Sequence, residues 1–194
     1  MKNILIINGH PNPNSYCAAL CKAYAEGAKK SGHQVVLLNL HELNFDSNFN
    51  GSYSSLKTQS LEKDLVFAQE KIRWAEHLVI VHPVWWGSVP ALLKGFFDKT
   101  LLPGFAFKYR QNSAFWDKLL QHKTAAIIYT ADTPPWYYRL VYRAPSVNML
   151  QHRVLGFCGI KTVSVTGIGP IRRSSQKFRE TWLAKVEKLG ESAK

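Results

Sequence analysis

The chain has 194 residues and a mass of 22.0 kDa, and its 46% apolar content predicts one globular domain over residues 1–194. Lysine and arginine exceed aspartate and glutamate by 25 − 13 = 12, so the surface favours anionic ligands. The basic residues are scattered and match no RNA- or DNA-binding motif, which argues against a nucleic-acid partner.

The apolar stretches are too short for export or membrane insertion. Four consecutive apolar residues, 4–7, precede the first polar loop, whereas a signal peptide needs roughly 7–15. The most apolar stretch, 78–86, is interrupted by His82 and Pro83 and falls short of the ~18 residues of a membrane helix. We expect a cytoplasmic protein with no integral membrane segment.

The three cysteines, Cys17, Cys21 and Cys158, include no Cys-x-x-Cys pair and are interpreted as structural free thiols. Cys17 and Cys21 lie four positions apart in a predicted helix, which leaves a soft metal site or a redox switch as the alternative. One nearby histidine, His10, is too little support for a metal ion, so no metal site is expected.

Strands and helices alternate in the first half of the chain. An apolar run at 2–8 predicts a strand, and helical spacing at 16–31 predicts a helix that ends before Gly32. Residues 34–40 then complete a βαβ unit, whose two strands are parallel. Residues 41–59 are polar and predict a long surface connection.

The second half continues this alternation. Ser60 is a candidate cap for a helix at 61–75, and Pro90 suits the first turn of a helix that runs to residue 99. The other predicted elements are strands at 77–82, 123–129 and 161–168, helices near 146–158 and 174–189, and a small excursion at 105–110. This pattern predicts an α/β three-layer sandwich: a five-stranded parallel sheet with helices on both faces.

In such sheets, ligands bind beyond the carboxyl ends of the strands, where the strand order reverses. For the order 2-1-3-4-5 this point lies between the first and third strands, beside the loops at 9–15, 83–88 and 130–138. The first loop leads into a helix, so its N–H groups and the Ser15 hydroxyl could hold a phosphate. An ordinary turn with a capping serine is the alternative, because the loop has no Walker pattern.

The other two loops are aromatic. Trp85 and Trp86 follow a strand directly, and their rings suit stacking on a planar ligand, while Gly87 lets backbone N–H groups approach the edge of that ligand. The third loop is stiffened by prolines and has donors that suit a developing oxyanion. The alternatives are a hydrophobic dimer interface for the tryptophans and a rigid loop that packs on a partner.

Three stretches carry a family resemblance. The most specific reads His-Pro-Val-Trp-Trp-Gly-Ser-Val-Pro-Ala-Leu-Leu-Lys-Gly-Phe-Phe-Asp-Lys at 82–99, followed by Pro-Gly-Phe-Ala-Phe at 103–107. The others are Asn-Gly-His-Pro at 8–11 with Ser15, and Gly-Phe-Cys-Gly at 156–159. From residue 1 to about 169 the sequence resembles the NAD(P)H:quinone oxidoreductase family of flavodoxin-like proteins.

The resemblance implies a flavin held by all three loops. The implied cofactor-binding residues are His10, Ser15, Tyr16 and Cys17 at the phosphate, Pro83, Val84, Trp85, Trp86 and Gly87 along the isoalloxazine, and Thr130 and Asp132 at its other edge. FMN is preferred over FAD, because the long C-terminal extension of the animal members is absent from this sequence. Those members also have a glycine pair where this chain has Ala131-Asp132.

The resemblance also suggests the catalytic residues. The family's catalytic tyrosine falls on Tyr137, with Tyr138 as the alternative, and Arg143 lies nearest the place of its catalytic histidine. The implied reaction is two-electron, ping-pong hydride transfer from NAD(P)H through the flavin to a quinone-like acceptor. The family's usual homodimer, with flavin sites at the subunit interface, is implied as well.

Some alternatives stay open at this point. Five arginines suit the extra phosphate of NADPH or are solvated surface charge, namely Arg110, Arg139, Arg143, Arg172 and Arg173. The alternative function is a flavin-binding regulatory subunit of a potassium efflux system, since relatives of this fold bind such systems. A flavodoxin-type one-electron carrier is disfavoured by the charge of +12, because those carriers resemble acidic proteins.

Overall fold

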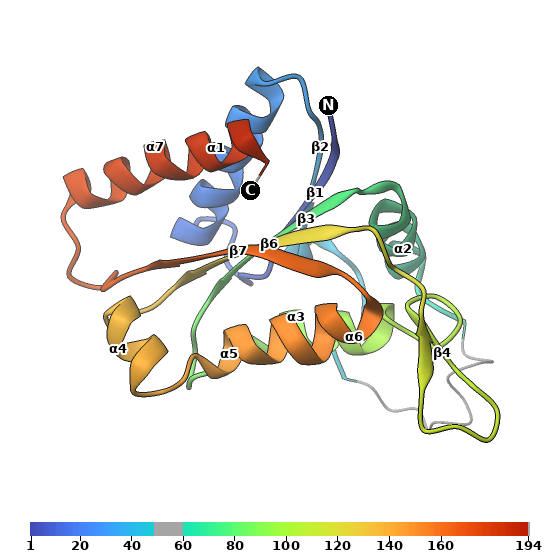
Figure 1. The fold of residues 1–194 in the computed structure, drawn as a ribbon. Helices are drawn as coiled ribbons and strands as arrows, with labels where there is room; N and C mark the ends of the chain where they lie inside the picture. The colour runs from blue at the N-terminus through green and yellow to red at the C-terminus, as the bar shows by residue number, and fades with distance from the viewer. Residues whose placement is uncertain (49–59, 194) are drawn as a thin grey trace.

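Five parallel strands form the centre of the structure, in the order β2-β1-β3-β6-β7 (Figure 1). They are β1 (Asn3–Asn8), β2 (Gln34–Asn39), β3 (His77–Pro83), β6 (Thr124–Thr130) and β7 (Lys161–Ile168). The computed structural model describes residues 1–48 and 60–193. The predicted order 2-1-3-4-5 is confirmed, because β6 and β7 are the fourth and fifth strands of this sheet.

Helices cover both faces of the sheet, as predicted (Figure 1). On one face lie α1 (Tyr16–Lys30) and α7 (Gln176–Ser192). On the other lie α2 (Lys63–Trp74), α3 (Ala91–Thr100) and a helical segment made of α5 (Pro145–Asn148), the π-helical η3 (Met149–Leu155) and α6 (Gly156–Cys158). The short elements are η1 (Leu40–Glu42), α4 (Pro135–Leu140) and the antiparallel pair β4 (Phe107–Tyr109) and β5 (Trp116–Lys118).

The alternation of side chains along the strands explains the two-sided core. Ile4 and Ile6 of β1 pack with α1 and α7, whereas Leu5 and Ile7 pack with the helices on the opposite face. The central strands β1, β3 and β6 are therefore apolar through their middle and almost completely buried. The edge strands β2 and β7 are only partly buried.

Helices α1 and α7 lie close together because glycines face backbone atoms where they meet. A Cβ atom at Gly27 would collide with the carbonyl oxygen of Glu187, and one at Gly190 with that of Tyr24. Nearer the sheet's carboxyl edge, the hydroxyl of Tyr16 donates to the carbonyl oxygen of Arg179 at 2.8 Å. This contact fixes the start of α7 beside the start of α1.

Some predicted details differ from the structure. The prediction that Ser60 caps a helix was wrong: α2 begins at Lys63, after Glu62, and no side chain caps it. The expected loop at 130–138 contains a helix, α4, because Pro135 at its first position already has a helical φ. Of the predicted connection at 41–59, residues 49–59 lie outside the described residues. The three cysteines are buried free thiols, as interpreted.

Two buried histidines predict that the stability of the fold depends on pH. Burial lowers the pKa of His77 and His82 to about 4, whereas an unfolded histidine titrates near ~6.5, so between these values the unfolded chain binds more protons. The free energy of unfolding should therefore fall as the pH drops through this window, by about 2 kcal/mol per histidine between about pH 7 and 5. Urea titrations at both pH values measure this loss.

The variant His82→Phe is the control for this prediction. It removes one of the two histidines while keeping a ring beside Tyr129, which stacks on His82 at 6.4 Å. The loss on acidification should therefore be roughly halved. An equal loss in parent and variant would show that other groups cause the acid sensitivity.

Candidate active site

A cavity of about 880 Å³ opens at the carboxyl ends of β1, β3 and β6. This is the predicted point where the strand order reverses, and the volume lies in the usual range of ligand sites. Every residue expected to bind the cofactor lines this cavity: His10, Ser15, Tyr16, Cys17, Pro83, Val84, Trp85, Trp86, Gly87, Thr130 and Asp132. Three loops that are far apart in the sequence thus line one cavity.

The first turn of α1 forms the anion-binding end of the cavity. The Ser15 hydroxyl oxygen accepts a hydrogen bond from the Ala18 N–H at 3.2 Å, so Ser15 caps the helix and still has its own O–H to donate. The N–H groups of Tyr16 and Cys17 make no hydrogen bond within the described part of the chain. Free N–H groups at the positive end of a helix are suited to a phosphate.

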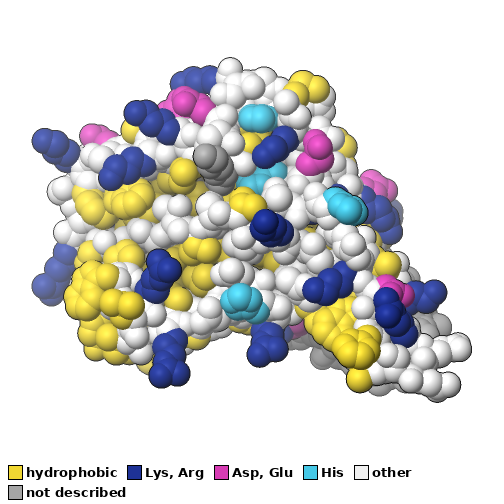
Figure 2. All heavy atoms as spheres, in the orientation of Figure 1, with side chains coloured by type: hydrophobic (Ala, Val, Ile, Leu, Met, Phe, Trp, Pro, Cys, Tyr) yellow, Lys and Arg dark blue, Asp and Glu magenta, His cyan; other side chains and the backbone are white. Residues whose placement is uncertain are grey.

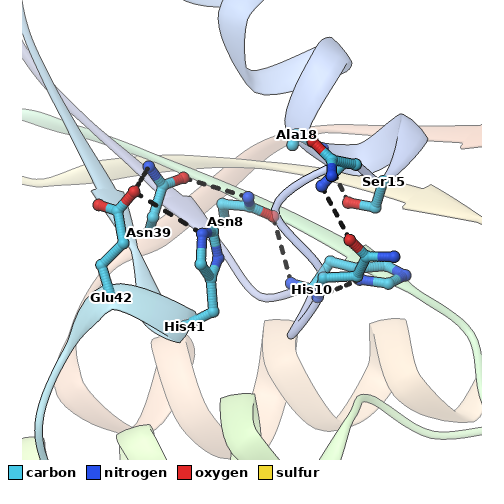
Figure 3. Close-up of polar contacts among 9 residues, drawn as sticks. Asn8, His10, Ser15, Ala18, Asn39, His41 and Glu42 are labelled. Atoms are coloured by element: carbon cyan, nitrogen blue, oxygen red, sulfur yellow. Dashed lines mark hydrogen bonds and ion pairs between the residues drawn. The ribbon is translucent and has the colours of Figure 1, made fainter.

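A chain of polar side chains holds the loop that precedes α1 (Figure 3). Asn8 is fully buried; its amide oxygen accepts from the His10 N–H at 3.2 Å, and its amide nitrogen donates to Asn39 at 3.1 Å. Asn39 donates in turn to the Glu42 carboxylate at 3.2 Å. The buried amide is therefore satisfied on both sides, which fixes where the loop leaves β1.

The hydrogen bonds of His10 define its tautomer. Its Nδ1 accepts from the Asn12 N–H at 2.9 Å, which leaves an Nε2–H donor for a ligand. Burial, together with His41, lowers the pKa of His10, so the ring is neutral near pH 7. The ring meets Trp85 edge-on, with 5.4 Å between centroids. His10 thus joins the phosphate end of the cavity to its aromatic end.

The second loop is a tight turn that presents backbone donors. Trp85 and Ser88 exchange backbone hydrogen bonds of 3.0 and 2.9 Å, and the two residues between them have positive φ, 51° at Trp86 and 77° at Gly87. The φ of Trp86 is strained for a residue with a side chain. The N–H groups of Trp86 and Gly87 bond to none of the described residues, so both can donate to the edge of a planar ring.

The third loop begins in contact with the first turn of α1. Thr130 and the buried Cys17 meet through their Oγ1 and Sγ atoms at 3.4 Å. Burial raises the pKa of the Cys17 thiol to about 11, so this cysteine stays protonated and is no nucleophile. The Asp132 carboxylate accepts from the backbone N–H of Arg172 at 2.8 Å, which ties this loop to the one after β7.

The structure separates the three candidate catalytic residues. Tyr138 lines the cavity and is buried; its hydroxyl donates to the Gly87 carbonyl at 3.0 Å, accepts from the Ser146 N–H at 3.0 Å and lies 2.7 Å from the Ser146 Oγ. Tyr137 packs edge-on against Tyr142 at the surface, and neither Tyr137 nor Arg143 is among the lining residues. Catalytic roles for all three residues stay predictions.

Sequence reasoning missed part of the lining. The missed residues are Asn12, Ala131, Thr133, Tyr142, Pro145, Ile171 and Arg179. Arg179 brings a positive charge to the first turn of α1, where its guanidinium lies 5.9 Å from the Tyr16 ring and donates to Ser174 and to the Ile171 carbonyl. Only the packing of α7 on α1 places it there, and no local pattern marks such a contact.

The comparisons with known proteins agree on one fold. The sequence matches the flavodoxin-like fold family over residues 2–190. A human ribosyldihydronicotinamide dehydrogenase (quinone) is 30% identical over 186 residues, which cover 84% of this chain and 79% of that protein. The Smu.1420 structure from Streptococcus mutans UA159 has a TM-score of 0.84 at 29% identity, with 98% of this chain and 99% of that one covered.

A more distant likeness supports the fold alone. The NAD(P)H:quinone oxidoreductase from Methanothermobacter marburgensis has a TM-score of 0.84 at 23% identity, and the match covers 100% of this chain and 99% of that one. Sheet order and cavity together define a flavodoxin-like protein. Within that class, the chain belongs to the NAD(P)H:quinone oxidoreductase family, as the resemblance implied. The protein is therefore an oxidoreductase.

The Tyr138 hydroxyl should hold the tryptophan turn in place. In Tyr138→Phe, the Gly87 carbonyl and the Ser146 N–H lose their partner, which should lower the free energy of unfolding by about 2 kcal/mol. Hydrogen exchange should also quicken in the turn at 85–88. Tyr137→Phe is the matched control, since its hydroxyl makes no hydrogen bond in the described part of the chain. Equal effects in the two variants would contradict this role.

Proposed function

We propose that this chain is a flavin-dependent NAD(P)H oxidoreductase that reduces quinones or similar aromatic acceptors. The observation that carries the proposal is the cavity itself, with free helix N–H groups at one end and the tryptophan turn at the other. A flavin mononucleotide has a phosphate and a planar ring that match these two ends. FMN is therefore the proposed cofactor, and FAD is the alternative.

The residues divide between the two ends of the proposed cofactor. The N–H groups of Tyr16 and Cys17, the Ser15 hydroxyl and the His10 Nε2–H would bind the phosphate. Residues 83–87 would lie along the ring, with the N–H groups of the turn at its edge. A bound flavin supplies the hydride chemistry, whereas the chain supplies position and electrostatics.

The proposed reaction follows a ping-pong course. NAD(P)H and the acceptor would enter through the same mouth, where Trp86 is fully exposed and Tyr142 is 54% exposed. One mouth favours successive binding of the two substrates, each held at contact distance from the ring. The Tyr138 hydroxyl donates its one proton to the Gly87 carbonyl, so its proposed part is to position the turn that would lie along the ring.

NADPH is the proposed hydride donor, because exposed arginines can pair with the extra phosphate that distinguishes it from NADH. Four of the arginines are exposed, namely Arg139, Arg143, Arg172 and Arg173. The backbone N–H of Arg172 donates to the carboxylate of Asp132, which lines the cavity. Arg110 is paired instead with Asp117 at 2.7 Å, on the β4–β5 hairpin, so it contributes less to this preference.

The cellular setting is part of the same proposal. We infer a homodimer, as the family resemblance implies, and a cytoplasmic location, as the short apolar stretches predict. No helix among the described residues is long and apolar enough to cross a membrane. The relatives carry the names of enzymes, which favours catalysis over the regulatory subunit of a potassium efflux system.

A visible spectrum tests the cofactor and the reaction together. The purified protein should show flavin absorption near ~450 nm that bleaches when NADPH is added without oxygen, because hydride transfer reduces the ring. Mass measurement of the released cofactor should identify FMN, and adding a quinone should restore the colour. A protein that stays colourless after soaking with FMN and with FAD would overturn the proposal.

Two glycines with the same backbone conformation test the place of the flavin. Gly87 (φ 77°) lies in the cavity, whereas Gly32 (φ 79°) follows α1 and has no atom within 4 Å of an added Cβ. Alanine strains either position by about 1 kcal/mol, but only Gly87→Ala should shift the ring-binding N–H groups. We expect FMN affinity to fall roughly tenfold in Gly87→Ala.

The control should separate stability from binding. Gly32→Ala should lose similar stability and keep the parent affinity for FMN, measured by quenching of flavin fluorescence. Equal affinity in both variants would place the ring away from the turn at 85–88.

A further inference from the structure

Arg179, near the start of α7, is the only lysine or arginine among the described residues that line the cavity. Its side chain is half-buried. Other Lys and Arg side chains are spread over the visible face of the molecule (Figure 2). A scattered positive surface attracts anions in general but does not choose where they bind. A single cation inside the cavity can make that choice.

The guanidinium of Arg179 is held by the turn at 171–174. Its Nε donates to the Ser174 Oγ at 2.9 Å, and one Nη donates to the Ile171 carbonyl at 3.2 Å. The Ser174 hydroxyl donates to the same carbonyl at 2.7 Å, so its oxygen is oriented to accept from the arginine. Because two of its nitrogens are held, the planar group is kept in one orientation before any ligand binds.

Tyr16 joins Arg179 to the phosphate end of the cavity. Its hydroxyl donates to the backbone carbonyl of Arg179 at 2.8 Å, and the guanidinium lies 5.9 Å from the centre of its ring. Burial raises the pKa of Tyr16 to about 12, so this hydroxyl keeps its proton and remains the donor. Tyr16 is also the first residue of α1, whose free N–H groups begin there. The cation therefore lies beside the positive end of that helix.

The charge of Arg179 has no counter-ion within the described part of the chain. None of the ion pairs there involves it. A guanidinium carries five N–H groups, and the contacts to Ser174 and Ile171 use only two of them. Asp132 also lines the cavity, but it belongs to the third loop and accepts from the backbone N–H of Arg172. A half-buried cation with unused donors is suited to an anionic ligand.

We propose that Arg179 makes the cavity select phosphorylated flavin over riboflavin, by pairing with the phosphate bound at the start of α1. The inference rests on the proposed function and adds the residue that decides for the phosphate. Riboflavin has the same ring and ribityl chain as FMN, with a hydroxyl in place of the phosphate. That neutral hydroxyl can accept from the helix N–H groups, but it leaves the guanidinium without a counter-charge.

Two other roles for Arg179 predict different behaviour. A purely structural clamp between α7 and the turn at 171–174 would support every flavin alike, because it would act on the shape of the cavity. A partner for the extra phosphate of NADPH would leave flavin binding unchanged. The contacts of Arg179 with Tyr16 favour the flavin phosphate, since Tyr16 contributes one of the free N–H groups of α1.

Paired titrations with FMN and riboflavin test the proposal. The full chain, freed of flavin, is titrated with each compound in the absence of nucleotide, and binding is measured by quenching of flavin fluorescence. Arg179→Gln should weaken FMN binding more than about tenfold, because charge-assisted hydrogen bonds to the phosphate are lost. Riboflavin binding should change less than about twofold, which also shows that the variant is folded.

Matched variants separate position from charge. Lys177→Gln removes the same charge from an exposed residue of α7 that does not line the cavity, so FMN affinity should change less than about twofold. Arg179→Lys keeps the charge and loses the planar fork, so its FMN affinity should lie between those of the parent and Arg179→Gln. Inorganic phosphate should compete with FMN more strongly in the parent than in Arg179→Gln.

Four outcomes would overturn the inference. They are parent affinity for FMN in Arg179→Gln, an equal loss for FMN and riboflavin, which would make Arg179 a structural clamp, and an equal loss in Lys177→Gln, which would assign the effect to overall charge. A parent that binds neither flavin is the fourth, and it would remove the proposed function as well. In the first three, a parent that binds FMN and bleaches with NADPH would keep the proposed function intact.

Discussion

The parallel pairing of β1, β3 and β6 is the constraint on which the site depends. Their register brings the ends of all three strands, Asn8, Pro83 and Thr130, to one edge of the sheet. Because both faces of these strands are covered by helices, the loops that follow can meet only beyond this edge. The cavity is therefore a consequence of the topology, and its chemistry depends on what the loops carry.

Polar contacts between loops then make the cavity rigid. Asn8 fixes the first loop through Asn39, and Tyr138 fixes the second loop through the carbonyl of Gly87. Neither contact uses the donors that remain free at the cavity: the first N–H groups of α1 and the N–H groups of the tryptophan turn. A site with positioned, unused donors can bind an anion and a planar ring without rearranging.

The sequence indicated the strands and the loops that line the cavity because both depend on local features. A buried parallel strand is an apolar run, and the loops at its end contain glycine, proline and aromatic residues. Two features could not be predicted in this way. Arg179 reaches the cavity through the packing of α7 on α1, and α4 begins at paired prolines that also occur in irregular loops. A long-range contact decides the place of Arg179, whereas the prolines before α4 suit both a helix and a loop.

Helix α4 has two roles that oppose each other. Its buried residue, Tyr138, shapes the cavity wall, while its exposed residues leave a large apolar surface in water. A chain selected only for solubility would carry polar residues at Leu140 and Val141, since neither side chain packs into the core. Trp86 and Tyr142 are exposed as well and also line the cavity, so the apolar surface begins at the cavity itself.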